Sequence, residues 1–391
     1  MKKFFTLSVA LTAALSSFSQ TNDSIKTDNS LLGHHIHQDD IRDKFRLYLH
    51  TKGSVGTDIN NKEFENAGFK MDQLRIEMKG ELNKSIYYRY QQRLTDISLD
   101  NFSADNLTTK IDYAGVGFKF NDKAKLFAGK MCTAYGTFEF DENPINVYQY
   151  STIHENMLAF LTGVDFSYNL TPKHELRLLA LSARTGSFEE TYGKVAKGVE
   201  QSKLDLVYTI NWNGVFGPND MFSTRWSASF LNETKEHNMY YLALGTAANF
   251  GKFSSYLDLL YSREELDRKR IISRNFGDQL NEITETNVDY KGAVLGVNYR
   301  ISPKVNLFAK GIFDNASKYK DSKDLKKGSY HNVWSYSGGI EYYPIKNDNL
   351  HINLTYIGRK YDFSSKSEKL GLKDYSQNRV ELSFIYCMNI F

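Results

Sequence analysis

The sequence predicts an all-β fold, a transmembrane antiparallel β-barrel of about sixteen strands. Apolar and polar residues alternate along many short segments, as in strands whose two faces meet different surroundings. The connections between these segments alternate between tight turns and long polar loops. The composition agrees, because 26 Tyr and 26 Phe accompany only 5 Pro, which is unusual for a helix-rich soluble enzyme.

Each predicted strand rests on this alternation. In residues 73–80, for example, Leu74, Ile76 and Met78 alternate with Arg75 and Glu77. The predicted strands are 45–55, 68–80, 82–94, 111–120, 124–131, 157–170, 173–185, 201–211, 222–231, 238–250, 252–262, 287–300, 304–313, 333–343, 348–358 and 378–391. Their lengths suit tilted strands that cross a hydrocarbon layer.

The connections distinguish a membrane barrel from a soluble sandwich. GELN, FNDKA, LTPKH, FGK, RISPK and PIKND are tight turns, and NWNGVFGPNDM is a longer member of the same set. The long loops are 56–67, 95–110, 132–156, 186–200, 232–237, 263–286, 314–332 and 359–377. An outer-membrane barrel places tight turns toward the periplasm and long loops outside, and about sixteen strands leave room for an aqueous channel.

The N-terminus predicts export. A basic start, an apolar run and small residues at Ser17 and Ser19 are typical of a signal peptide over residues 1–19. The alternative is a short hydrophobic anchor, although the run is shorter than a bilayer span. We expect residues 20–44 to form a periplasmic tail and residues 45–391 to form the barrel. The expected location is therefore the outer membrane of a Gram-negative bacterium, crossed many times.

Composition and motifs argue against several other functions. A net charge of +3 argues against nucleic-acid binding. Cys132 and Cys387 do not make a disulfide framework, although a single bridge between them stays open. No nucleophile elbow, zinc-protease motif or phosphate-binding loop is present. We expect no catalytic residues, no cofactor and no metal.

Histidines offer the two alternatives to that expectation. The run of His34, His35 and His37 could bind a transition metal, but it precedes the first strand and is better interpreted as periplasmic tail. An enzyme on a barrel lip would need clustered side chains. The candidates His154, His237 and His331 lie on the outer side without an evident partner in the sequence.

The stretch GKMCTAYGTFEFDENPINVYQYS, residues 129–151, carries a resemblance to a known family. Gly129 and Lys130 in the fifth strand, then Tyr135, Gly136 and Glu139, resemble the pattern of the phosphate-selective porin O and P family. The resemblance implies a trimeric general-diffusion or anion-preferring channel, with the third long loop, 132–156, folded into the barrel. The chain departs from the family at Ala134, where a proline is usual, and its acidic loop weakens the expectation of phosphate selectivity.

Charges on the lumen face are the candidate functional residues, because charges that line a narrow pore select ions. The pore-lining and anion-binding candidates are Arg75, Arg89, Arg93, Lys130, Arg177, Arg225 and Lys310. The candidates in the constricting loop are Tyr135, Gly136, Glu139, Asp141 and Glu142. The alternative is a solvated wall on which mixed charges merely pair. Together, a basic stripe on the second and third strands and an acidic loop opposite it would produce a transverse field.

The charge-dense segment SREELDRKRIISR, residues 262–274, has acids three to four residues ahead of Arg268 and Lys269. This spacing favours a helical turn in a solvated extracellular loop. An alternative is contact with lipopolysaccharide phosphates.

The sequence therefore predicts a porin that passes small polar or anionic solutes, phosphate among them. Its expected partners are those solutes, outer-membrane lipid and lipopolysaccharide, and two further copies of the chain. The alternative is a closed barrel that serves as a receptor, adhesin or enzyme.

Overall fold

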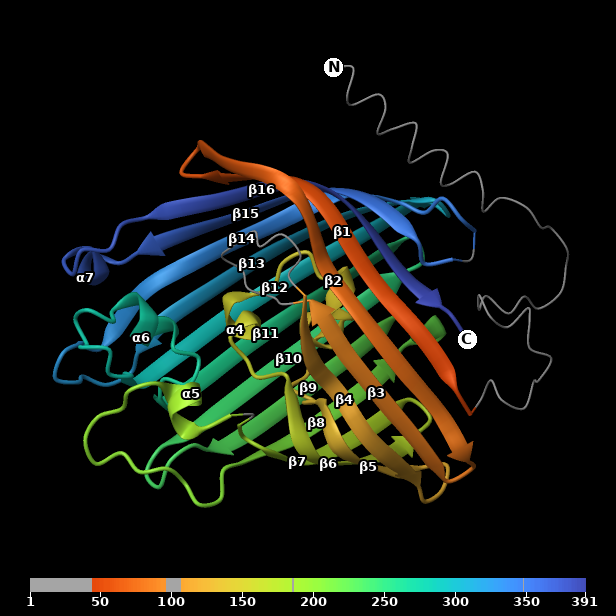
Figure 1. The fold of residues 1–391 in the computed structure, drawn as a ribbon, viewed down its shortest axis with the longest axis horizontal. Helices are drawn as coiled ribbons and strands as arrows, with labels where there is room; N and C mark the ends of the chain where they lie inside the picture. The colour runs from red at the N-terminus through yellow and green to blue at the C-terminus, as the bar shows by residue number, and fades with distance from the viewer. Residues whose placement is uncertain (1–43, 96–106, 185, 347) are drawn as a thin grey trace, which may run out of the picture.

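The computed structural model describes residues 44–95, 107–184, 186–346 and 348–391. These residues form a closed barrel in which sixteen antiparallel strands pair with their sequence neighbours and β1 pairs with β16. The short helices α5, α6 and α7 gather at one end of the barrel, and the C-terminus lies at the other (Figure 1). The predicted signal peptide, its tail and the three clustered histidines lie outside the described residues.

The strand bounds confirm all sixteen predicted strands. They are β1 Arg46–Asn60, β2 Glu63–Asn83, β3 Ile86–Thr95, β4 Leu107–Lys119, β5 Ala124–Cys132, β6 Phe160–Thr171, β7 His174–Ser182, β8 Leu206–Phe216, β9 Phe222–Asn232, β10 Asn238–Phe250, β11 Phe253–Leu266, β12 Thr286–Ser302, β13 Val305–Lys318, β14 Gly328–Tyr342, β15 His351–Phe363 and β16 Tyr375–Asn389. The short helices are α3 Phe138–Asp141, η1 Pro144–Asn146, α4 Thr152–Glu155, α5 Phe188–Tyr192, η2 Pro218–Asp220, α6 Ile271–Asn275 and α7 Ser365–Glu368.

The two faces of the wall follow the predicted alternation. Leu354 on β15 lies opposite Leu382 on β16, and their side chains are 51% and 46% exposed on the outer surface. Asn353 and Thr355, the neighbours of Leu354 in β15, are buried on the inner face of the wall. A closed barrel pairs every backbone group along the wall, so apolar side chains can face lipid without unpaired polar groups beside them. No helix in the described part of the chain is long and apolar enough to cross a membrane.

Three predicted connections are wrong in extent, because strands continue beyond the apolar alternation. The first long loop, 56–67, is mostly strand, and β1 turns directly into β2 at Asn61 and Lys62, both with positive φ. β13 and β14 likewise extend into the predicted loop 314–332. At the opposite end, residues 211–216 of the predicted long turn belong to β8. Outside the hydrocarbon layer a strand needs only backbone partners, so polar sequence no longer marks its end.

Candidate functional site

The segment between β5 and β6, residues 133–159, is called the inner loop here. It begins against β9 and β10, where the Tyr135 ring packs edge-on against Tyr241 at 5.5 Å and Ser227 donates a hydrogen bond to the Tyr135 carbonyl. Gly136 has φ +75°, and a Cβ at this position would lie 2.9 Å from Ser227 Oγ. Gly136 therefore permits both the left-handed turn and the close approach to the wall.

Helix α3 attaches the inner loop to β11. The Thr137 hydroxyl accepts from the Phe140 N–H and caps the helix. Asp258 Oδ1 and Oδ2 accept from the N–H groups of Phe138 and Glu139 at 3.0 and 2.8 Å. A wall carboxylate thus satisfies the first backbone donors of the helix, the position at which negative charge is most favourable.

Glu139 links the inner loop to β13. Its Oε1 accepts from Lys310 Nζ at 3.0 Å, and its Oε2 contacts His154 Nδ1 at 2.6 Å. Burial opposes ionisation of this carboxyl, but Lys310, His154 and the Ser151 N–H outweigh it and lower the pKa of Glu139 to about 2. The Tyr241 hydroxyl lies 3.2 Å from the other imidazole nitrogen, so His154 is held from both sides. No pattern in the sequence indicated these partners for His154.

The far part of the inner loop reaches β14 and β15. Arg359 donates to both Glu155 oxygens at 2.7 and 2.8 Å and to the Tyr150 carbonyl at 2.9 Å. The Tyr148 ring stacks on Phe308 at 4.6 Å, and its hydroxyl donates to Glu341 at 2.7 Å.

The inner loop also contacts the wall on its other side, where Gln73 of β2 donates to the Pro144 carbonyl at 2.9 Å. It leaves the wall between β5 and β6 and contacts inward side chains of β2, β9, β11, β13, β14 and β15. Those strands lie on opposite sides of a closed barrel. The loop therefore crosses the interior, and its aromatic rings pack against the wall as the sequence predicted.

A cavity of about 1830 Å³ remains beside the inner loop. Its lining runs from Pro172 and Lys173 in the β6–β7 turn to Asn60 and Glu65 beside the β1–β2 turn, at opposite ends of the barrel. Eight arginines, two lysines and seven carboxylates line it. The cavity thus extends toward both ends of the barrel, and its lining carries a modest excess of positive charge.

The β2–β3 wall carries the predicted basic stripe. Arg75 and Arg93 share one buried carboxylate, Asp112, at 3.6 and 3.0 Å. Arg89 pairs with Glu77 at 2.8 Å and lies 3.6 Å from the centre of the Tyr113 ring. Arg75, Arg89 and Arg93 all line the cavity. Because two guanidinium groups share Asp112, this wall keeps net positive charge.

Two further candidates line the cavity from other strands. Arg177 on β7 pairs with Asp165 at 2.6 Å. Arg225 on β9 pairs with Asp141 of the inner loop at 3.2 Å and lies over the Phe138 ring. Lys310, described above, is 11% exposed at its side chain and acts on the inner loop through Glu139.

Lys130 does not face the lumen, which corrects the sequence prediction. It lies in register with Ala114 and Thr162, on the face that exposes Val116 and Val164 to the outside. Phe127 and Met131 point inward instead and are buried. The prediction assumed that apolar residues always face lipid, and this rule fails where the wall supports an interior loop.

The acids of the inner loop are mostly neutralised by the wall. Glu139, Asp141 and Glu155 each pair with a cation on a different strand. Glu142 accepts only from Asn143 and Asn146 of its own loop. No cation pairs with it within the part of the chain that the structure describes. The free acidic face expected opposite the basic stripe is thus reduced to one carboxylate.

The outer half of the barrel beside β8–β13 is filled by a second structure, the outer-loop core. Its charged and phenolic members are Tyr192, Glu233, Glu264, Asp267, Arg268, Lys269 and Tyr290, all buried. Lys269 pairs with Glu264 and donates to Ser262 at 2.8 Å. Arg268 donates to Tyr192 at 2.8 Å, and Tyr290 donates to Asp267 at 2.6 Å.

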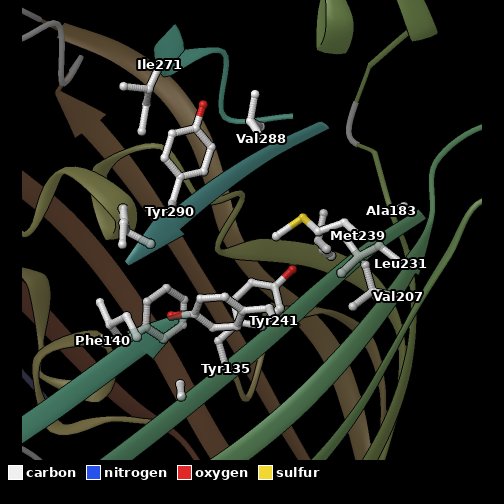
Figure 2. Close-up of a cluster of buried hydrophobic side chains, with 14 of the residues drawn as sticks. Tyr135, Phe140, Ala183, Val207, Leu231, Met239, Tyr241, Ile271, Val288 and Tyr290 are labelled. Carbon is white, nitrogen blue, oxygen red and sulfur yellow. The ribbon is translucent and has the colours of Figure 1, made fainter. Parts of the chain in front are cut away.

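The outer-loop core overturns both interpretations of residues 262–274. Residues 262–266 are strand, and the helix begins only at Ile271. Arg268 and Lys269 are buried, so they neither stay solvated nor reach surface phosphates. Figure 2 shows apolar neighbours of this core, with Tyr135, Phe140 and Tyr241 in one group and Ile271, Val288 and Tyr290 above them. The loop charges and aromatics pack together, which the local sequence did not indicate.

A family model for phosphate-selective porin O and P matches residues 45–387. The chain belongs to this family. No curated protein matches the sequence significantly.

Solved structures support the fold at low identity. The outer membrane channel DcaP of Acinetobacter baumannii is 14% identical with a TM-score of 0.62, over 88% of this chain and 96% of that one. The anion-selective porin from Comamonas acidovorans is 8% identical with a TM-score of 0.58, over 88% and 99%. The trimer form of OmpT of Vibrio cholerae is 10% identical with a TM-score of 0.55, over 88% and 100%. This porin therefore resides in the outer membrane and forms a channel rather than a closed receptor barrel.

Proposed function

We propose that this porin passes small anions, phosphate among them, by passive diffusion along the β2–β3 wall, and that the inner loop narrows the route. The observation that carries the proposal is the charge of the cavity lining, ten cations against seven carboxylates. Three of the four acids of the inner loop are already paired with the wall. An anion that passes the loop therefore meets more cationic groups than carboxylates along the lining.

The aromatic partners of these guanidinium groups support the same route. Arg89 lies over the Tyr113 ring, 3.6 Å from its centre, and planar guanidinium groups present N–H donors in a fixed geometry. Such donors can replace part of the water that an oxyanion loses in a narrow passage. The name of the Comamonas relative, an anion-selective porin, agrees with this preference.

Planar-bilayer recording across a salt gradient tests the selectivity. Replacing Arg89 and Arg93 by Ala removes two lumen charges. A unit charge about 8 Å from an ion in water contributes about 0.5 kcal/mol. With screening, we expect the anion-to-cation permeability ratio to fall by about twofold to fivefold.

Lys130→Ala is the control, because it removes one positive charge from the outer face of β5. It should leave the reversal potential unchanged. Equal shifts in the two variants, or no shift in either, would contradict the proposed route.

We further propose that three copies of the chain assemble, which the trimer form of OmpT supports by likeness of fold. Cross-linking of the protein in its native outer membrane should give a three-copy species. A monomer at every cross-linker concentration would refute this assembly.

A further inference from the structure

A thiol, an imidazole and a carboxylate lie in line across three strands that meet at the β1–β16 closure. His50 on β1 is in register with Cys387 on β16, and its Nδ1 lies 3.1 Å from Cys387 Sγ. On the other side, His50 Nε2 lies 3.1 Å from Glu77 Oε2 on β2. Glu77 lines the cavity described above, whereas His50 and Cys387 are not among its lining residues.

The carboxylate fixes the proton positions on the imidazole. Arg89 and Lys79 hold the other oxygen of Glu77 at 2.8 and 3.4 Å, so Glu77 acts as an acceptor only. The Nε2 atom of His50 must then carry the proton that Glu77 accepts. In neutral His50, the lone pair is left on Nδ1 and faces the Cys387 thiol, so the imidazole is oriented to accept the S–H proton.

A nucleophile, a base within hydrogen-bonding distance and a third group that orients the base are the parts of an activated thiol. Arg75 lies in register with His50 on β2. Cys387 is partly exposed and lies two residues before the end of β16, so a small molecule can reach it.

We propose that Cys387 is a reactive thiol that takes up low-molecular-weight disulfides as a mixed disulfide, with His50 as the base. The Cys387 proton passes to His50 Nδ1 as the sulfur attacks one sulfur of the disulfide. The S–S bond of the small molecule breaks, a new S–S bond forms at Cys387, and the leaving thiolate takes the proton from His50. One equivalent of free thiol is released, and no further oxidant is needed.

The second cysteine provides an internal reference. Cys132 lines the cavity, yet no imidazole lies within hydrogen-bonding distance of its sulfur among the described residues. Cys132 is thus a cysteine in the same barrel without a base. The proposal predicts different reactivity for the two thiols, whatever ion the channel prefers.

The experiment uses the full folded protein in detergent and a symmetric nitro-aromatic disulfide whose released thiolate is coloured. Cys132→Ser leaves Cys387 as the reacting thiol, and Cys387→Ser leaves Cys132. We expect Cys387 to release one equivalent at a rate at least about tenfold above that of Cys132, because an imidazole that can take the proton lies 3.1 Å from the Cys387 sulfur. Reductant should restore the free thiol.

His50→Gln, made in the Cys132→Ser background, keeps a polar side chain that cannot take a proton. We expect it to slow Cys387 by at least about tenfold, and added imidazole should recover part of the rate in His50→Ala. His351→Gln on neighbouring β15 is the control, because His351 stacks on Tyr343 and does not contact the thiol. An unchanged rate in His50→Gln, or a Cys387 no faster than Cys132, would overturn the proposal. Heat-modified gel mobility confirms that each variant remains folded.

Discussion

The outer-loop core and the cavity use the same residue types for different purposes. In the outer-loop core, Lys269 and Arg268 are buried, and they are held by partners on β11 and α5, respectively. Along the cavity, Arg89 and Arg93 also have carboxylate partners but keep exposed surface toward the lumen. Burial, and not charge alone, therefore separates cations that hold loops in place from cations that can meet a solute.

The largest effect is expected from breaking the outer-loop core. Lys269→Ala leaves Glu264 buried without its cation, which typically costs about 3–5 kcal/mol. The loss should appear as faster proteolysis and faster amide exchange within residues 267–285, while the strands remain protected. Since Lys269 itself does not line the cavity, ion selectivity should change little.

Lys235→Ala is the control for this prediction, because its pair with Glu200 is exposed on both sides. It should leave proteolysis unchanged. If Lys269→Ala and Lys235→Ala behaved alike, the outer-loop core would not be a distinct stabilising unit.

The contrast between the outer-loop core and the cavity also shows how much of the structure could be predicted from the sequence. The alternation of apolar and polar residues identified every strand and placed Arg75, Arg89 and Arg93 on the lumen side. This was possible because successive residues of a strand face opposite sides of the wall. It failed for Lys130, where Phe127 and Met131 turn inward to support the inner loop. It also failed for Arg268 and His154, which have partners on loops and strands far away in the chain. Whether a side chain is buried inside the barrel depends on which loop residues pack against it. No local sequence pattern predicts those contacts.

An intermediate effect is expected at Glu139, where the inner loop is attached to the wall. Glu139→Gln leaves Lys310 without its carboxylate, and a buried charge-assisted hydrogen bond is worth about 1.5–3 kcal/mol. We expect a looser inner loop, seen as added current noise in single-channel records with little change in mean selectivity. Glu155→Gln should add a similar disturbance at the Arg359 contact.

The pH dependence of this attachment follows from the lowered pKa of Glu139. Because the pKa falls from 4.5 to about 2 in the folded state, the stabilisation is complete above 4.5 and is lost as the pH falls through about 2. Current noise in the native protein should therefore stay low down to pH 3 and rise below it, whereas Glu139→Gln should be noisy at every pH. Noise that changed with pH in the same way in the native protein and in Glu139→Gln would contradict the assignment of this titration to Glu139.

The smallest effect is expected at Glu142. It tests the distinction between charges that hold loops in place and charges that can meet a solute. This carboxylate lines the cavity and holds nothing on the wall, so Glu142→Gln should change neither loop noise nor proteolysis. It removes one negative charge from the solute route, and the anion-to-cation permeability ratio should rise by less than about twofold. The sign is opposite to that of the Arg89 and Arg93 replacements, and the size should be about half in logarithmic terms. A Glu142 variant that altered noise but not selectivity would place this acid with the structural charges, and the anion route would then have to run along a different part of the wall.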